Sequence, residues 1–536
     1  MAKISNKEKS LHLLIFLILT INLLGSNLQA MESEEKPPNI IFILADDMGY
    51  GDVEAYNRNS KIPTPHLNKL AKGGMVFTDA HTSSSVCTPT RYALLTGRYN
   101  WRSRLQASVT WGFSKRLIED GRSTVANILQ SAGYHTSCIG KWHLGMNWPL
   151  LTDGIADDGN TWKSKYRQGW AVDFSKPITQ GPTSLGFNHF FGISASLDMP
   201  PYVYIRNDRP LVTQVVEKAF NRKGPADIDF EAVDVMPRLA YETIRKINKW
   251  APDSKSGKPF FLYVPLAAPH TPIVPSSEWV GRSQLNDYGD FTMQVDQLVG
   301  TVYRCLQRND ILEDTLFIFS TDNGCSPAAN LKEMEGKGHF ANAPWRGHKA
   351  DIYEGGHRVP FIVHWPRQVA AGSRSDSLIC QTDFLSTCAE IAGQAVDSKT
   401  GEDSFSFLKI IKGDTEMTHV DFLGKRRTVV HHSINGSFAV RSGNWKLSLC
   451  PGSGGWSQPK PGSRESKTLP PVQLYNLKTD PSESKNLHAK YPEKVKELYD
   501  ILSRYVANGR STPGPMSENT VVVDFAKGVP DQNWKP

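Results

Sequence analysis

Strand-like and helix-like segments alternate along most of this chain, and this alternation constrains the fold more than any other feature. Four apolar runs predict buried strands, at residues 39–45, 135–139, 260–264 and 316–321. Amphipathic segments between them predict helices, at about residues 124–132, 230–250 and 291–307. This order favours an α/β fold in which a large mixed, mostly parallel sheet is sandwiched by helices.

The pattern changes past about residue 420. Short strand-like segments with turns between them follow, at residues 426–431, 437–441 and 445–449, and residues 491–508 predict an amphipathic helix. We expect a large α/β domain over residues 31–420 and a smaller C-terminal α+β subdomain, an antiparallel sheet plus a helix, over residues 421–536.

Two stretches lack a clear period. Residues 147–230 form a long stretch that is rich in Gly, Trp and Asp. We expect this stretch to form loops over the edge of the sheet at which the candidate site residues described below lie. The tail from Thr512 is rich in Pro, Gly and Asp, and we expect it to cover the surface without regular structure.

The N-terminus has the pattern of a signal peptide. Three lysines precede an apolar run over residues 11–24, and a small-residue exit follows at Leu28–Ala30. We expect cleavage after Ala30 and export to the periplasm or the medium, with an uncleaved anchor as the alternative. No later segment is long and apolar enough to cross a bilayer, so stable membrane insertion is not expected.

Charge and cysteine usage exclude some classes of protein. The net charge of +7 fits a polyanionic substrate but is common among proteins that bind none, and it gives no reason to expect nucleic acid as a partner. The seven cysteines include no pair of C-x-x-C motifs, so neither a disulfide scaffold nor a zinc site is indicated. Cys380 and Cys388 lie in an apolar helical stretch and are interpreted as buried thiols; one or two disulfides elsewhere stay open.

Polar side chains follow each of the four predicted strands, where ligands bind in open α/β sheets. In chain order they are Asp46 and Asp47, then Lys141 and His143, then His270, then Asp322 and Asn323. Asp46 and Asp47 alone are ordinary in a turn or helix cap. Together with Asp322 and Asn323 they favour a metal site, and their oxygen atoms suit Ca²⁺, or Mg²⁺, rather than zinc.

The run Cys87-Thr88-Pro89-Thr90-Arg91 leads into a helical stretch. Cys87 would then lie at a helix N-terminus, where backbone N–H groups favour an anion. The alternatives are an inert buried thiol for Cys87 and a surface salt bridge for Arg91. In Gly140–Gly145, Lys141 and His143 alternate, so an extended backbone would project both to one face.

Two further motifs carry candidate residues. His270 stands between Pro269 and Pro272, which stiffen its backbone; capping of a loop is the alternative role. Arg346-Gly347-His348-Lys349 precedes a second run, Tyr353 to Pro360, in which Glu354 and Arg358 stand four residues apart.

These motifs resemble those of the type I, formylglycine-dependent sulfatases, of the arylsulfatase family in the alkaline phosphatase superfamily. The Cys87 run resembles the C-x-P-x-R signature, with Thr90 where Ser or Ala is usual. Gly140–Gly145 is similar to G-K-W-H-L-G, and the later runs are similar to R-G-x-K and E-G-G-x-R-x-P. The resemblance spans about residues 37–500 and implies an alkaline-phosphatase-like fold and a sulfuric ester hydrolase.

The resemblance also implies a role for each site residue. Cys87 is oxidised to formylglycine (3-oxoalanine) by a formylglycine-generating or sulfatase-maturating enzyme, and its hydrated form attacks sulfur. Arg91 holds this residue, His143 deprotonates it with Lys141 alongside, Lys349 binds the sulfate, and His270 protonates the departing alcohol. Sulfatases usually carry calcium, and we count Cys87 with Asp46, Asp47, Asp322 and Asn323 as ligands.

The substrate is expected to be a sulfated carbohydrate, such as glycosaminoglycan, carrageenan or ulvan fragments, by analogy with exported sulfatases. Asp198 and Tyr202 are candidate sugar-binding residues beside His270 and Lys349, with loop packing as the alternative. His81, Trp111, Trp170 and His189 are weaker candidates. A phosphate or phosphonate ester hydrolase of the same superfamily, or a non-catalytic glycan-binding relative, are the other interpretations. The sequence does not predict an oligomeric state.

Overall fold

In this computed structural model, the structure describes residues 36–151, 162–415, 419–425, 427–531, 534 and 536. The predicted signal peptide, residues 1–30, lies outside the described residues. Within the described ranges, no helix combines the length and the apolar character that a membrane span requires.

A ten-stranded sheet forms the centre of the described chain, in the order β13–β2–β12–β11–β1–β10–β4–β5–β6–β7. The strands from β11 to β5 run parallel, and β12, β6 and β7 add antiparallel pairs at the two sides. Their bounds are β1 (Asn39–Ala45), β2 (Met75–Phe77), β4 (His135–Lys141), β5 (His189–Ile193), β6 (Tyr204–Arg206), β7 (Arg209–Leu211), β10 (Phe260–Pro265), β11 (Thr315–Thr321), β12 (Phe361–His364) and β13 (Ser373–Ser375).

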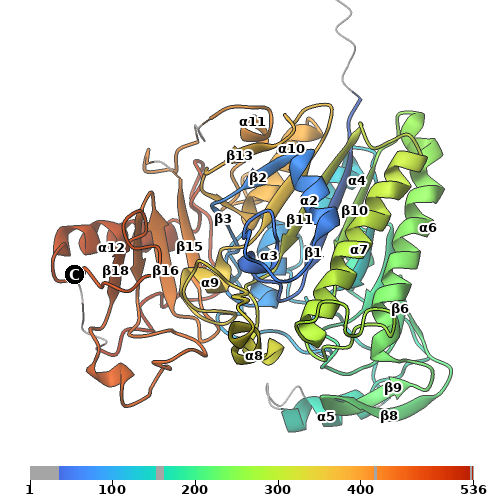
Figure 1. Cartoon of the computed structure of the whole chain (residues 1–536), viewed down its shortest axis with the longest axis horizontal. Coiled ribbons are helices and arrows are strands. Elements are labelled where there is room, and N and C mark those ends of the chain that lie inside the picture. Colours follow the sequence, from blue (N-terminus) through green and yellow to red (C-terminus); the bar gives the residue numbers. More distant parts are fainter. Residues whose placement is uncertain (1–35, 152–161, 416–418, 426, 532–533, 535) are drawn as a thin grey trace, which may run out of the picture. The chain divides into compact units, whose positions relative to one another are not determined.

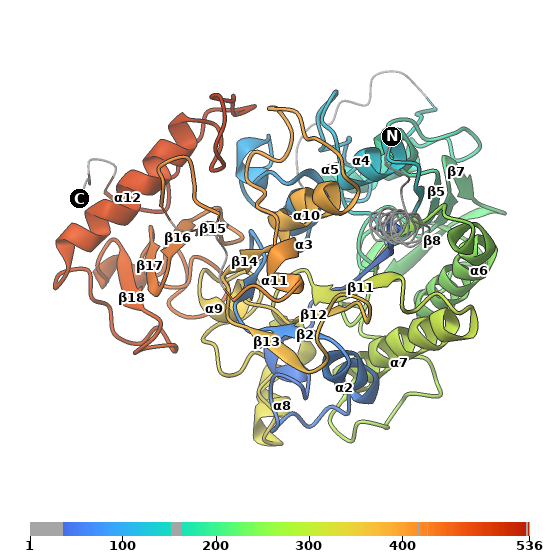
Figure 2. The same ribbon diagram turned by 90° about the horizontal axis from the view of Figure 1, so that it is seen from above.

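Helices cover both faces of this sheet (Figures 1 and 2). Ile41 and Ile43 of β1 belong to the core under α2 (Pro65–Lys72), α6 (Val235–Lys255) and α7 (Asp287–Arg308). Ile40, Phe42 and Leu44 belong to the opposite core, under α3 (Cys87–Thr96), α4 (Val125–Ser131), α10 (Phe384–Ile391) and α11 (Leu408–Ile411). Because successive strand residues point to opposite faces, an unbroken apolar strand needs a helical layer on each side.

The fold class and the main elements are confirmed. All four predicted strands are present, as β1, β4, β10 and β11, and the three predicted helices are α4, α6 and α7. α6 begins later than predicted because a 3-10 turn, Ala232–Asp234, takes up the residues before it. The order of strands and helices along the chain therefore predicted the central sheet and the helical layers that cover it.

The prediction that residues 147–230 form loops is wrong for much of that stretch. It contains β5, β6 and β7, which extend the central sheet, and the hairpin β8 (Val215–Phe220) and β9 (Arg222–Asp227). It also contains α5 (Trp162–Trp170). These strands are short, and every residue of β8 is exposed or only half-buried, so they lack the run of buried apolar residues on which the prediction depended.

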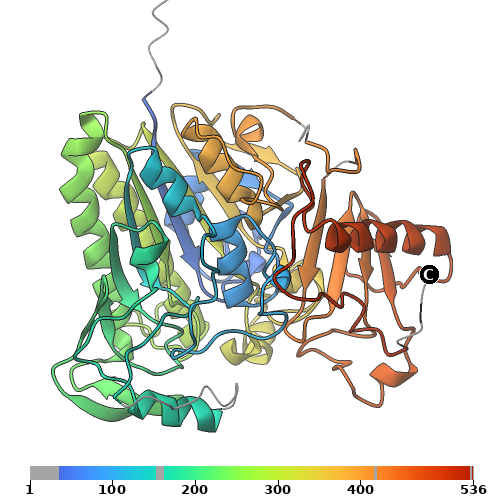
Figure 3. The same cartoon turned by 180° about the vertical axis from the view of Figure 1, so that it is seen from behind.

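The C-terminal part forms a four-stranded antiparallel sheet, β15 (Thr428–His432), β16 (Phe438–Ser442), β17 (Trp445–Ser448) and β18 (Gln473–Asn476). α12 (Pro492–Ala507) packs on it through a separate apolar cluster, as Figure 3 shows in red. The sheet and helix are confirmed, although β18 was not predicted. No helix or strand is assigned beyond Thr512 in the described residues, as expected.

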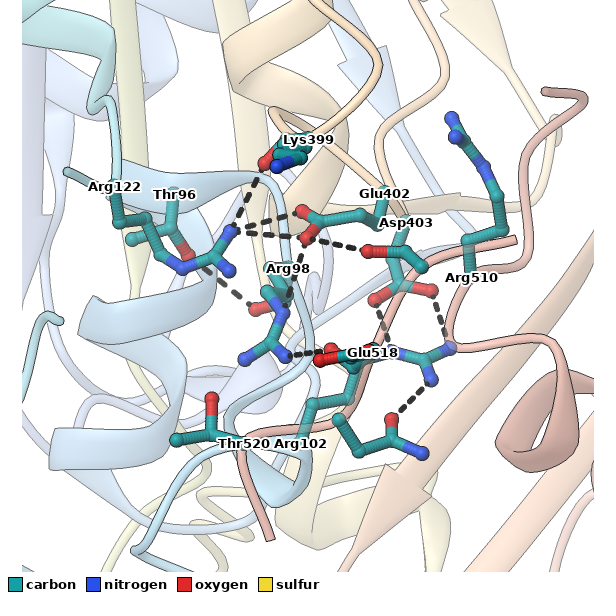
Figure 4. Close-up of polar contacts among 12 residues, drawn as sticks. Thr96, Arg98, Arg102, Arg122, Lys399, Glu402, Asp403, Arg510, Glu518 and Thr520 are labelled. Carbon is teal, nitrogen blue, oxygen red and sulfur yellow. Dashed lines mark hydrogen bonds and ion pairs between the residues drawn. The ribbon is translucent and has the colours of Figure 1, made fainter. Parts of the chain in front are cut away.

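A buried network of arginines and carboxylates, here the α3–tail network, joins the end of α3 to the C-terminal tail (Figure 4). Arg102 makes a bidentate pair with Asp403, at 2.8 and 2.9 Å, and Asn519 accepts a further bond from it at 2.8 Å. Arg98 pairs with Glu402 at 3.3 Å and donates to the carbonyl of Glu518 at 2.9 Å. Paired charges of this kind are stable in a protein interior only while every partner is in place.

Two small elements connect the sheet edge to the C-terminal part. They are α9 (Glu354–His357) and the two-stranded sheet of β3 (Ala80–His81) and β14 (Ile379–Cys380). α8 (Leu331–Gly336) lies in the segment before Lys349. All seven cysteines fall in the described ranges; they are buried and form no disulfide there, which confirms Cys380 and Cys388 as buried thiols.

Candidate active site

The ends of β1 and β11 bring four polar residues together. Asp46 and Asp47 follow β1, and Asp322 and Asn323 follow the neighbouring β11, with which it pairs in parallel. The backbone N–H of Asp47 donates to Asp322 Oδ1 at 3.2 Å, and Asn323 Nδ2 donates to Asp47 Oδ1 at 2.7 Å. All four side chains are buried, so the three carboxylates and the amide require partners inside the protein.

Cys87 is the first residue of α3, as the helical stretch after it predicted. Its side chain is buried, and burial raises the pKa of its thiol. Thr90, which departs from the usual signature, donates through its hydroxyl to the carbonyls of Ser84 and Val86, both at 3.2 Å. The threonine is therefore accommodated by local hydrogen bonds at the helix start.

Arg91 lies one helical turn after Cys87 and points toward the carboxylates. It donates to Asp322 Oδ2 from Nε at 3.0 Å and from Nη2 at 2.7 Å, and to the carbonyl of Lys141 at 3.1 Å. Arg91 is fully buried, so the alternative of a surface salt bridge does not apply to it. It ties α3 to the ends of β11 and β4.

Two lysines each hold one of the adjacent aspartates. Lys141 Nζ lies 2.6 Å from Asp46 Oδ2, and Lys349 Nζ lies 2.6 Å from Asp47 Oδ1. Burial opposes the ionised form of Asp46, but Lys141, His270 and Arg91 hold its pKa well below the usual range. Burial acts against the charge of Lys349 also, but Asp47 and its neighbours raise the pKa of this lysine.

The donor set fits a hard divalent cation. Asp46 Oδ1 and Asn323 Oδ1 are buried oxygens for which the described residues supply no hydrogen-bond donor. Burial and the carboxylate of Asp46 raise the pKa of Asp322 to about 7. Unpaired oxygens and crowded carboxylates are the conditions that a bound Ca²⁺ or Mg²⁺ relieves.

The two candidate histidines approach the site from different loops. His143 has a φ of 56°, so the chain turns after β4, and the expectation of an extended segment there is wrong. Its Nε2 lies 2.7 Å from the carbonyl of Thr110, while its Nδ1 has no partner within the described structure. His270 places Nε2 3.6 Å from Asp47 Oδ2 and Nδ1 2.7 Å from the carbonyl of Thr271.

Two supporting residues were not predicted from the sequence. Thr110 orients His143 through its carbonyl, and its hydroxyl donates to the carbonyl of His143 at 2.9 Å. Ser196 lies 2.9 Å from His270 Nδ1 through its hydroxyl. Both stand in irregular segments whose sequence has no period or motif, so no signal marked them.

The candidate sugar-binding residues differ in their surroundings. Asp198 forms an ion pair with Arg222, and its Oδ1 is buried without a donor from the described chain. Tyr202 is 1% exposed, packs on Phe220 and Phe230, and donates through its hydroxyl to the carbonyl of Arg222. The structure brings Asp198 near the site and gives Tyr202 extensive loop packing.

A second group of histidines, here the histidine cluster, lies between the sheet edge and the C-terminal sheet. It consists of His81, His357 and His431, all fully buried. The rings of His357 and His431 stack with centroids 3.8 Å apart, and His81 Nδ1 lies 3.1 Å from His357 Nδ1. Buried ion pairs surround it, made by Asp79, Glu354, Glu483, Arg358, Arg441 and Lys446. Both ring nitrogens of His81 have partners within this group, His357 and Asp79, so the structure gives His81 a place in the cluster rather than in the sugar-binding site.

Comparison with known proteins assigns this arrangement to a class. The family model described as Sulfatase matches residues 38–394. The chain therefore belongs to the sulfatase family, and it is a sulfuric ester hydrolase with the alkaline-phosphatase-like fold that the resemblance implied.

Individual relatives are similar over most of their length. An N-acetylgalactosamine-6-O-sulfatase of Bacteroides thetaiotaomicron is 30% identical over 506 residues, covering 87% of this chain and 92% of that protein. Human arylsulfatase A is 30% identical over 479 residues, covering 84% of this chain and 83% of that protein. A solved Bacteroides thetaiotaomicron structure, reported with the metabolism of multiple glycosaminoglycans, superimposes with a TM-score of 0.73 at 26% identity. The superposition covers 88% of this chain and 99% of the chain in that structure.

Proposed function

We propose that this sulfatase removes sulfate from a sulfated carbohydrate, using a formylglycine made from Cys87. One observation carries the proposal: Cys87 begins the helix whose Arg91 contacts Asp322, and Lys141, Lys349 and His270 lie at the neighbouring carboxylates of Asp46 and Asp47. This arrangement supports the attack of a nucleophile at residue 87 on an anionic ester, with cations placed to offset the developing charge.

Asp46, Asp47, Asp322 and Asn323 are the residues that would hold the cation, with residue 87 alongside. A bound Ca²⁺ would polarise the sulfuryl oxygens, and Mg²⁺ is the alternative. The unpaired Asp46 Oδ1 and Asn323 Oδ1 support this assignment because each offers an available lone pair.

His143 is suited to the role of general base. A carbonyl can only accept, so the contact with Thr110 fixes the proton of His143 on Nε2 and leaves Nδ1 with a free lone pair. Burial, together with Lys141 and Arg91, holds the pKa of His143 well below its ordinary value, so the ring is neutral. Nδ1 can therefore take a proton from a hydroxyl on residue 87.

His270 is suited to the role of general acid. The carbonyl of Thr271 accepts a hydrogen bond from Nδ1 at 2.7 Å, and Nε2 lies 3.6 Å from Asp47 Oδ2, so these contacts hold the ring with Nε2 toward the site. From this position Nε2 is the atom that would deliver a proton to the departing alcohol oxygen, with Lys349 beside it to bind the sulfate. Arg91 holds the helix start, and Lys141 holds Asp46 ionised.

The carbohydrate class is supported by the relatives and by the polar loop near His270. One relative bears the name N-acetylgalactosamine-6-O-sulfatase, and this chain aligns with most of the length of that protein. We assign sugar contact to Asp198, His270 and Lys349, and give Tyr202 the role of holding the Arg222 backbone. Export by the predicted signal peptide fits a polymeric substrate outside the cytoplasm.

The test combines mass and turnover. The protein is produced together with a maturation enzyme, and the mass of the peptide that contains Cys87 is measured by mass spectrometry. Hydrolysis is then measured for sulfated sugars, an aryl sulfate and an aryl phosphate. We expect conversion to the aldehyde, sulfate release from at least one sugar, and no turnover by Cys87→Ala. Cys305→Ser is the matched control, because Cys305 is a buried thiol in α7 whose sulfur donates to Asn248 and accepts from Asn309, away from the site residues. Faster turnover of the phosphate than of any sulfate would favour a phosphoesterase, and no turnover of any ester would favour a glycan-binding relative.

A further inference from the structure

The hairpin β8–β9 carries an arginine that the reaction does not use. Arg222 is the first residue of β9, and Figure 1 shows this hairpin beside α5, away from the helices that cover the sheet. Its side chain is 32% exposed, whereas the catalytic cations are buried. An exposed cation held close to a buried active site calls for a role of its own.

Three contacts fix the position of Arg222. Nη1 pairs with the carboxylate of Asp198 and donates to the carbonyl of Asp198 at 3.3 Å. The guanidinium lies over the ring of Trp111, 5.2 Å from its centroid. The hydroxyl of Tyr202 holds the carbonyl of Arg222. A guanidinium held in this way loses little conformational entropy when it binds a ligand.

The same contacts connect Arg222 to the two segments whose residues contact His143 and His270. Trp111 directly follows Thr110, whose carbonyl orients His143. Asp198 stands two residues after Ser196, whose hydroxyl contacts His270. Burial opposes the ionised form of Asp198, but His270 and then Arg222 lower its pKa, which agrees with a short distance between Asp198 and His270.

Part of the guanidinium is not used by the protein. Nη1 makes the contacts with Asp198, while Nε and Nη2 have no hydrogen-bond partner among the described residues. These two groups form the edge of a planar fork that matches two oxygens of a carboxylate or sulfate. The sulfate that is cleaved is already assigned to Lys349, so the group that Arg222 binds is a different one.

We infer that Arg222 is a specificity residue that binds a second anionic group of the substrate, either a uronate carboxylate or a second sulfate. The inference rests on the proposed carbohydrate sulfatase function and narrows its substrate class to glycans with two nearby anionic groups. Trp111 supports the guanidinium, and Asp198 fixes its direction while leaving one edge available.

The experiment compares kcat/KM for three sulfated sugars with the same scissile sulfate. One carries no other charge, one carries a second sulfate, and one is linked to a uronate. We expect the wild-type enzyme to prefer one of the two dianionic substrates by about tenfold to a hundredfold, the range of a charge-assisted bidentate contact. Arg222→Gln should bring the ratio of kcat/KM between the dianionic and the monoanionic sugar close to one, mainly through KM. Arg222→Lys should retain part of the preference.

The matched control is Lys223→Gln, which removes a charge from the neighbouring residue of β9 that is 57% exposed. It should retain the preference. Equal kcat/KM for the three sugars, or a preference that Arg222→Gln leaves intact, would overturn the inference while the proposed function stands. Sulfate release from aryl sulfate but from no sugar would overturn both. The two dianionic arms distinguish a carboxylate from a sulfate as the bound group.

Discussion

Replacing His431 with phenylalanine should make this protein less sensitive to acid. His431 stacks on His357 in the histidine cluster, and its Nδ1 donates to the carbonyl of Thr82 at 2.9 Å. Burial, with His81 and Lys446 nearby, holds the pKa of His431 well below its ordinary value. The folded protein therefore keeps this ring neutral at pH values where the unfolded chain protonates it.

The sign and size of the effect follow from this difference. Because the unfolded state binds the extra proton, the stabilisation is complete above the unfolded pKa of about 6.5 and is lost as the pH falls below it. Between pH 8 and pH 5 the loss amounts to about 2 kcal/mol for one histidine whose folded pKa is far lower. Burial likewise holds the pKa of His357 well below its ordinary value, so this residue adds a similar loss.

The assay is denaturant unfolding of the wild type and His431→Phe at several pH values between 8 and 5. The lost bond to Thr82 should cost the variant about 1 kcal/mol at every pH. The variant should then gain about 2 kcal/mol relative to wild type as the pH falls to 5, so that the order of stability reverses. A constant difference across this range would refute the assignment of His431 as a neutral buried group.

Three further changes test other parts of the structure. Asp403→Asn leaves Arg102 buried without its bidentate partner and should lower the free energy of unfolding by about 3–5 kcal/mol, measured by denaturant titration; a loss below about 1 kcal/mol would contradict the burial of this pair. Lys446→Met removes the cation between Glu354 and Glu483, at 3.1 and 2.9 Å, and should destabilise the protein by a similar amount, with a thermal midpoint that rises again as acid protonates the carboxylates. Removing divalent cations with a chelator should lower the thermal midpoint. If the cation was present at a hundred times its Kd, the free energy of unfolding should fall by about 2.7 kcal/mol. An unchanged midpoint with full activity would exclude the metal site.

Much of the fold could be predicted because it depends on local pattern. The strands β1 and β11 are unbroken apolar runs, and the polar residues after them had to meet once the two strands lay side by side in parallel. The amino-acid pattern alone is therefore enough to place Asp46 and Asp322 at one edge of the sheet. The weakly patterned hairpin β8–β9 gave no comparable signal, and Arg222 was missed with it.

The remaining parts of the site depend on contacts between irregular segments. Thr110 and Ser196 act through a carbonyl and a hydroxyl whose positions are set by loops, and the turn at His143 needs a positive φ that the sequence does not announce. The histidine cluster joins residues from β3, α9 and β15, far apart in the chain. Such long-range arrangements follow from tertiary packing, which sequence periodicity does not encode.

Because of the α3–tail network, the region that follows the helix of Cys87 can be buried only after the C-terminal tail has been synthesised. The partners of Arg98 and Arg102 include Glu402, Asp403, Glu518 and Asn519, so the last of them lie close to the C-terminus. A chain that emerges N-terminus first cannot complete the burial of this region until almost its whole length is available. We therefore expect an enzyme that modifies the Cys87 thiol to act before the segment with Glu518 and Asn519 has packed against Arg98 and Arg102.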